Sequence, residues 1–95
     1  MIRVVVLYDE APDPQRYEDH LELCRAVPGA GTFCHGPIFG SPLGEPQHRY
    51  YAEFEWPDRE SFEAAVASPE FAACGEDAMA MGRKFSVEFA ELETL

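Results

Sequence analysis

A short segment near the start of the chain, residues 2–8, is apolar on both of the faces that a β-strand presents. It reads Ile-Arg-Val-Val-Val-Leu-Tyr, and Arg3 is its only charged residue. β-Branched residues at this density favour a strand, and a strand that is apolar on both sides is stable only where both sides are covered. We therefore expect this segment to lie at the centre of a sheet, with other parts of the protein packed against each face.

The segments that follow predict a helix and then two strands. Asp13-Pro14 is a helix start, because an N-cap residue precedes proline at the first helical position, and Pro28-Gly29 ends that helix. Residues 32–39 predict a strand, which Gly36-Pro37 confines to an edge of the sheet. Residues 49–56 alternate between apolar and polar side chains and predict a strand with one buried face.

The last part of the chain predicts helical structure and a closing strand. Asp58 caps one helix, and Ser68-Pro69 starts a second helical piece that runs to about Gly82. Residues 85–92 alternate again and predict the last strand. The resulting order, β-α-β-β-α-β, is typical of a ferredoxin-like α+β fold. Right-handed crossovers then place the first and third strands at the centre of a four-stranded antiparallel sheet, with the helices on one face.

A chain of 95 residues has room for one core, so we expect a single domain over residues 1–95. No further element is left to cover the second face of the sheet. On that face we expect an apolar patch formed by Val5, Leu7, Tyr51 and Ala90. Arg3 lies there within reach of Glu53 or Glu88. Because such a patch is rarely left in water, we predict a homodimer in which two sheets meet face to face.

Charge and apolar patterning exclude several classes of partner. Eighteen acidic and seven basic residues give a net charge of −11, which argues against binding to nucleic acid or to anionic membranes. The longest apolar run is far too short to span a membrane, and no signal peptide is recognisable, so we expect a cytoplasmic protein. Cys24, Cys34 and Cys74 are odd in number and form no C-x-x-C motif, which predicts reduced, buried thiols.

His20 is the main candidate for chemistry. It lies beside the sheet-facing stripe of Tyr17, Leu21 and Cys24, so its imidazole can reach the space between helices and sheet. There it could take up or release a proton near neutral pH. The alternative is a structural histidine that is bonded to a strand carbonyl. Tyr8, at the end of the central strand, is predicted to donate a hydrogen bond to the same ligand, with an ordinary core aromatic as the alternative.

Several aromatic side chains are expected to line the gap between helices and sheet and to bind an apolar substrate. These predicted substrate-binding residues are Tyr17, Tyr50, Phe54, Trp56 and Phe89. For each of them the alternative is ordinary core packing. Asp77, on the last helix, is either an orienting group or a surface charge, and Glu53 with Glu55 is either a carboxylate pair or a set of dimer-facing charges.

No metal or cofactor is expected from sequence motifs. His20 and Cys24, together with Cys34-His35, match no common zinc spacing, and neighbouring strand residues point to opposite faces. Gly29-Ala30-Gly31 follows a helix and lacks the third glycine of a dinucleotide-binding loop.

The chain resembles the EthD family over nearly its whole length. The resemblance is carried by Met-Ile-x-Val-Val-Val-Leu-Tyr at residues 1–8, His20-Leu21-x-Leu23, Pro28-Gly29, Tyr50 to Trp56, Ser68-Pro69-Glu70 and Asp77. Glu22 stands where the family usually has proline. The resemblance implies a dimeric α/β barrel of ferredoxin-like subunits. The family is named for a gene cluster that degrades ethyl tert-butyl ether beside a cytochrome oxygenase system, and its members are often called reductases.

Together these features predict a small cofactor-independent catabolic enzyme, of oxidoreductase, oxygenase or lyase type. It would act on a small apolar organic molecule held between sheet and helices, with His20 as general acid or base. One alternative is a non-catalytic binding or accessory protein for a hydrophobic metabolite or a partner oxygenase. Another is a dimer whose cavity is filled by its own side chains.

Overall fold

The computed structural model describes all residues from 1 to 95, and its elements follow the predicted order. They are β1 (Ile2–Tyr8), α1 (Pro14–Arg25), β2 (Thr32–Pro37), β3 (Tyr50–Trp56), α2 (Arg59–Val66), α3 (Pro69–Ala80) and β4 (Phe85–Glu91). The predicted strand at residues 32–39 is two residues too long. It ends at Pro37, which has no backbone N–H to continue the ladder.

The four strands form one antiparallel sheet in the order β2-β3-β1-β4. The doubly apolar strand β1 is therefore central, and it pairs with β3 on one side and with β4 on the other. β2 is an edge strand, as its Gly36-Pro37 pair predicts. The α+β ferredoxin-like fold expected from the order of elements is confirmed.

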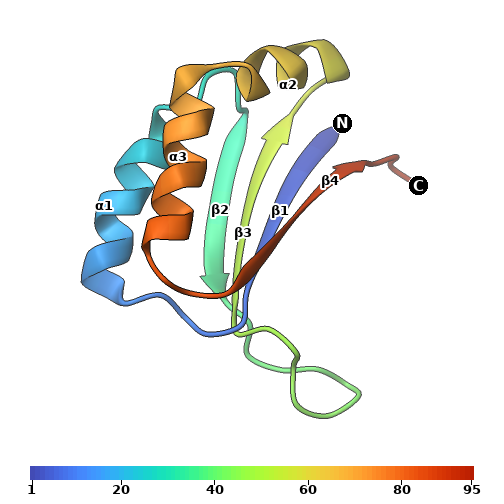
Figure 1. Ribbon diagram of the computed structural model, residues 1–95. Helices are drawn as coiled ribbons and strands as arrows, with labels where there is room; N and C mark the ends of the chain where they lie inside the picture. The colour runs from blue at the N-terminus through green and yellow to red at the C-terminus, as the bar shows by residue number, and fades with distance from the viewer.

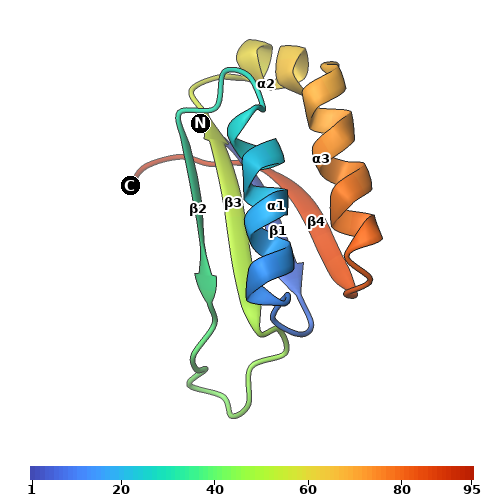
Figure 2. The same ribbon diagram turned by 90° about the vertical axis from the view of Figure 1, so that its left-hand side faces the viewer.

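All three helices lie on the same face of the sheet (Figures 1 and 2). α1 and α3 lie side by side and run roughly along the strands, and α2 lies at the end where β3 finishes. None of the helices has the length and apolar content needed to cross a membrane. The other face of the sheet carries no helix, and the loop between β2 and β3 extends beyond the sheet (Figure 1).

The core between the helices and the sheet is densest around Trp56, at the end of β3. Its side chain is fully buried, and its indole Nε1 donates a hydrogen bond to the carbonyl oxygen of Pro28 at 3.2 Å. Phe54 and Phe62 pack against the ring, with centroids 5.5 Å away in each case. The Trp56 bond therefore ties the loop after α1 to the sheet.

Two N-caps determine where helices α1 and α3 begin. The carboxylate of Asp13 accepts a hydrogen bond from the backbone N–H of Arg16 at 3.2 Å, and Pro14 follows as the first residue of α1. Ser68 Oγ accepts from the N–H of Phe71 at 3.1 Å, and Pro69 starts α3. Because Ser68 interrupts the helical stretch, α3 starts afresh and turns Cys74 and Ala78 toward the core.

The helix-free face of the sheet combines apolar side chains with a paired charge. Val5 and Leu7 are only half-buried there. Nε of Arg3 lies 3.0 Å from Glu53 Oε2, an ion pair without the alignment of a hydrogen bond, and a second guanidinium nitrogen lies 3.6 Å from Glu55. The predicted contact of Arg3 with Glu53 is confirmed, while Glu88 makes no ion pair with it.

We predict that Ser68→Ala lowers the free energy of unfolding by about 1 kcal/mol, because the start of α3 loses its cap. Urea denaturation followed by circular dichroism measures this change. Ser41→Ala, in the exposed loop between β2 and β3, is the matched control and should change stability by less than about 0.5 kcal/mol. Equal effects of the two substitutions would contradict a role for Ser68 in starting α3.

Candidate active site

An apolar cavity of about 100 Å³ lies between the sheet and helices α1 and α3. Thirteen of its fifteen lining residues are hydrophobic, so the cavity selects against charged molecules. Its walls are Val4, Val6, Tyr8, Tyr17, His20, Cys24, Phe33, Ala52, Phe54, Phe71, Cys74, Gly75, Ala78, Phe85 and Val87. Gly75 and Val87 are exposed, so the cavity reaches the surface between α3 and β4.

His20 is the buried polar side chain in this wall. Only 4% of the residue is exposed. Its Nδ1 lies 2.9 Å from Asp77 Oδ2, a hydrogen-bonded contact that joins α1 to α3. The sequence left open that His20 is a structural histidine bonded to a strand carbonyl. In the structure its hydrogen-bond partner is Asp77 instead. The orienting alternative for Asp77 is the one observed.

Arg16 holds Asp77 from the other side. Its two terminal nitrogens donate to the two carboxylate oxygens at 3.1 and 2.6 Å, which is the bidentate geometry that guanidinium groups favour. This hydrogen bond is the largest contribution that lowers the pKa of Asp77, so the residue stays ionised. Arg16, Asp77 and His20 thus form a chain of charge-assisted contacts from the surface to the cavity.

The pKa of His20 reflects two opposing influences. Burial lowers it, because the imidazolium is poorly solvated, but contacts with Cys74 and Asp77 raise it and prevail. An ionised Asp77 that accepts from Nδ1–H leaves Nε2 as the nitrogen with a free lone pair. The arrangement can therefore accept a proton at Nε2 and stabilise the imidazolium that results.

Tyr8 and Tyr17 meet edge to face in the same wall, with ring centroids 6.2 Å apart. Burial raises the pKa of each phenol above its ordinary value, so both hydroxyls remain protonated. The hydroxyl of Tyr17 is buried and has no hydrogen-bond partner. A buried unpaired hydroxyl costs roughly 1–3 kcal/mol, which makes Tyr17 a ready donor to a polar atom of a ligand.

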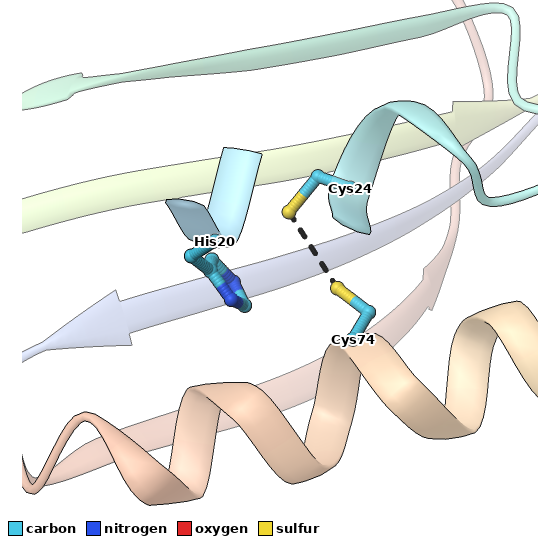
Figure 3. Close-up of side chains that lie close together, drawn as sticks. All are labelled: His20, Cys24 and Cys74. Atoms are coloured by element: carbon cyan, nitrogen blue, oxygen red, sulfur yellow. Dashed lines mark hydrogen bonds between the residues drawn. The ribbon is translucent and has the colours of Figure 1, made fainter. Parts of the chain in front are cut away.

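Two thiols complete the polar side of the cavity. Sγ of Cys24, from α1, lies 3.5 Å from Sγ of Cys74, from α3, and both side chains point toward His20 (Figure 3). The hydrogen bond from Cys24 lowers the pKa of Cys74, and His20 lowers it further, while burial opposes both effects. Cys24 and Cys74 are buried as predicted, but Cys34 is exposed, because β2 is an edge strand that no helix covers on that side.

The residues predicted from sequence divide into two groups. Tyr8, Tyr17, His20 and Phe54 come together in the cavity wall. The other three predicted substrate-binding residues, Tyr50, Trp56 and Phe89, lie outside it.

The three outlying residues have different surroundings. The ring of Tyr50 packs against that of Tyr17, with centroids 5.3 Å apart. Its hydroxyl lies 2.8 Å from Nδ1 of His35, within hydrogen-bond distance. Trp56 is fully buried and packs against Phe62. Phe89 is 58% exposed at the edge of the sheet. Binding roles for all of these residues remain predictions.

Arg16 and Cys74 belong to the site but were not predicted from sequence. One signal was available: Cys74 and Asp77 are three residues apart, and His20 and Cys24 are four apart, so each pair lies on one face of its helix. Two helices on the same face of a sheet can pack with these residue pairs facing each other. The spacing within each helix does not show whether the two pairs meet.

Comparisons with known proteins support the fold and the predicted resemblance. No family model matches the chain, and no curated protein does. An EthD family protein from Bacillus halodurans C-125 is 29% identical, with a TM-score of 0.82 over 98% of this chain and 99% of that one. The resemblance to the EthD family is therefore supported by structure as well as by sequence order.

Two less similar structures share the fold. A dimeric ferredoxin-like protein of unknown function from Jannaschia sp. CCS1 is 16% identical, with a TM-score of 0.74 over 96% of this chain and 98% of that one. A hydroxynitrile lyase from Passiflora edulis is 14% identical, with a TM-score of 0.74 over 99% and 95% of the two chains. At these identities the likeness is one of fold.

We predict that Asp77→Ala destabilises the protein by roughly 1–3 kcal/mol, because buried Nδ1 of His20 loses its partner. Arg16→Ala should cost less, roughly 0–1 kcal/mol, because its guanidinium is 35% exposed and the bond between Asp77 and His20 survives. Chemical denaturation of both variants measures which substitution costs more stability. Glu76→Ala, at an exposed neighbouring position, is the control. A cost for Arg16→Ala equal to that for Asp77→Ala would show that the imidazole contact contributes nothing.

Proposed function

We propose that this protein is a small cofactor-independent enzyme that binds a small, largely apolar organic molecule in the cavity and uses His20 to move one of its protons. One observation carries the proposal: a buried imidazole, held at Nδ1 by an ionised carboxylate, faces an apolar cavity that reaches the surface. A buried imidazole needs a hydrogen-bond partner in any role, but a carboxylate that an arginine keeps ionised also stabilises the imidazolium that proton uptake would form.

The proposed step is general acid–base catalysis. Nε2 of His20 takes a proton from the bound molecule, and the imidazolium that forms is stabilised by Asp77 at Nδ1. Arg16 keeps Asp77 ionised, so the carboxylate does not need to take the proton itself. The surrounding apolar wall excludes water and strengthens these charge interactions.

The size and polarity of the cavity limit the ligand. A cavity of about 150 Å³ holds benzene, so the 100 Å³ available here suits a molecule of a few heavy atoms. The unpaired hydroxyl of Tyr17 favours a ligand with one acceptor, such as a carbonyl oxygen, and Tyr8 is a second protonated donor beside it. We infer a small carbonyl or hydroxyl compound with an otherwise apolar body.

The comparisons are compatible with such chemistry. The EthD resemblance supports small-molecule metabolism, and the fold shared with a hydroxynitrile lyase supports a catalytic use of this architecture on small organic molecules. Removal of a proton by a positioned base is a step that many lyase and oxygenase reactions require. The alternative is a carrier for the same kind of molecule, which would need the cavity but not the base.

We expect His20→Gln to abolish proton transfer but to retain binding. Small ketones such as butanone provide the probe, because a base exchanges the hydrogens beside the carbonyl for deuterium in heavy water. Wild-type protein should accelerate this exchange by roughly 10²–10⁴-fold over the variant, as measured by proton NMR. His48→Gln, in a histidine outside the cavity that pairs with Asp9, is the matched control. Equal exchange with wild type and His20→Gln, with binding retained, would instead identify a carrier.

We also propose that the working unit is a homodimer that buries the helix-free face of the sheet. Val5 and Leu7 leave an apolar strip on that face, and the Jannaschia protein of the same fold is described as dimeric. Arg3 already has carboxylate partners within its own subunit, so covering this face leaves no unpaired cation. A second copy of the chain is the occupant that suits such a self-complementary surface.

The dimer predicts a solution mass of twice 10.7 kDa at micromolar concentration. Leu7→Glu should shift the protein to monomer, because it places a carboxylate at the centre of the apolar strip, opposite Tyr51. Ala64→Glu, on the exposed side of α2, adds the same charge elsewhere and should leave the dimer intact. Sedimentation velocity measures all three proteins, and a monomeric wild type would refute the dimer.

A further inference from the structure

His20, Cys24 and Cys74 form a compact buried group, which we call the thiol–imidazole cluster. A ring nitrogen of His20 and both sulfur atoms lie within 4.8 Å of one another. The two sulfur atoms are 3.5 Å apart, and each of the three residues is at most 7% exposed. Figure 3 shows the three side chains converging from α1 and α3 on one point.

The donor atoms are those that thiophilic divalent cations prefer. Two thiolates and an imidazole are the protein ligands of one known kind of zinc site, in which a fourth position stays open. Thiolates bound at about 2.3 Å to a tetrahedral zinc ion are about 3.8 Å apart. The observed 3.5 Å is close to that separation, so the two sulfur atoms are already spaced for one ion.

The surroundings also suit an ion. Metal-bound histidines usually donate their other ring nitrogen to a carboxylate, and here Asp77 already engages Nδ1 of His20 at 2.9 Å, leaving Nε2 for the ion. A divalent cation with two thiolates and a neutral imidazole carries no net charge. The cluster can therefore hold such an ion beside an apolar cavity without an uncompensated buried charge.

We propose that the thiol–imidazole cluster binds one thiophilic divalent cation, of which Zn²⁺ is the physiological representative, with one coordination position open to the cavity. The site needs no substrate, but it uses the same nitrogen of His20 as the proposed proton transfer. It has a consequence for that reaction, because an ion on Nε2 of His20 removes the lone pair that acts as the base. Bound metal would therefore inhibit the reaction that the metal-free protein is proposed to perform.

Titration of the reduced wild-type protein with Co²⁺ under anaerobic conditions tests the site. One equivalent per chain should produce a thiolate-to-cobalt charge-transfer absorption band, which excess Zn²⁺ then removes. The band should be lost in Cys24→Ser and in Cys74→Ser but kept in Cys34→Ser, since Cys34 is the exposed cysteine outside the cluster. Absence of the band from wild type, or its persistence without Cys24 and Cys74, would overturn the proposal.

Two further measurements do not depend on the folding of the cysteine variants. X-ray absorption of the zinc-loaded wild type should show two sulfur ligands at about 2.3 Å and a nitrogen at about 2.0–2.1 Å, and a shell of oxygen and nitrogen alone would refute the site. Asp77→Asn should weaken Co²⁺ binding by roughly 10–100-fold while the charge-transfer band persists. None of these readouts involves turnover, so failure of the metal site and failure of the proposed catalysis are separate results.

Discussion

The arrangement of the site depends on the hydrogen bonds that the carboxylate of Asp77 makes with Arg16 and His20. Asp77 belongs to α3, while both of its side-chain partners, Arg16 and His20, belong to α1. The same group therefore fixes the spacing of two helices and the orientation of the imidazole between them. His20, whose imidazole this contact orients, is part of the cavity wall.

Most of the fold could be predicted from local patterns. A strand apolar on both faces has to be central, and β1 is. Proline after a capping serine has to restart a helix, and Ser68 does so ahead of α3. His20 could be predicted as the candidate site residue because a polar side chain beside an apolar helical stripe is conspicuous at the sequence level. Each of these inferences uses residues only a few positions apart.

The rest depends on distances between elements, which local patterns do not contain. Alternation along β3 correctly places Phe54 and Trp56 on the same face, but it does not say that Phe54 borders a cavity while Trp56 is fully buried outside it. Cys74 meets Cys24 only because α1 and α3 pack at a particular depth and rotation. Phe89 is on the predicted face of the edge strand β4, but its contact with Phe62 of α2 leaves 58% of the residue exposed.

Helices and strands both line the cavity, but the polar chain beside it comes from the helices alone. The residues of this hydrogen-bonded chain, Arg16, Asp77 and His20, all come from helices, whereas the strands supply apolar wall such as Val6 and Ala52. Substitutions among strand residues can thus reshape the cavity while the polar chain stays in place.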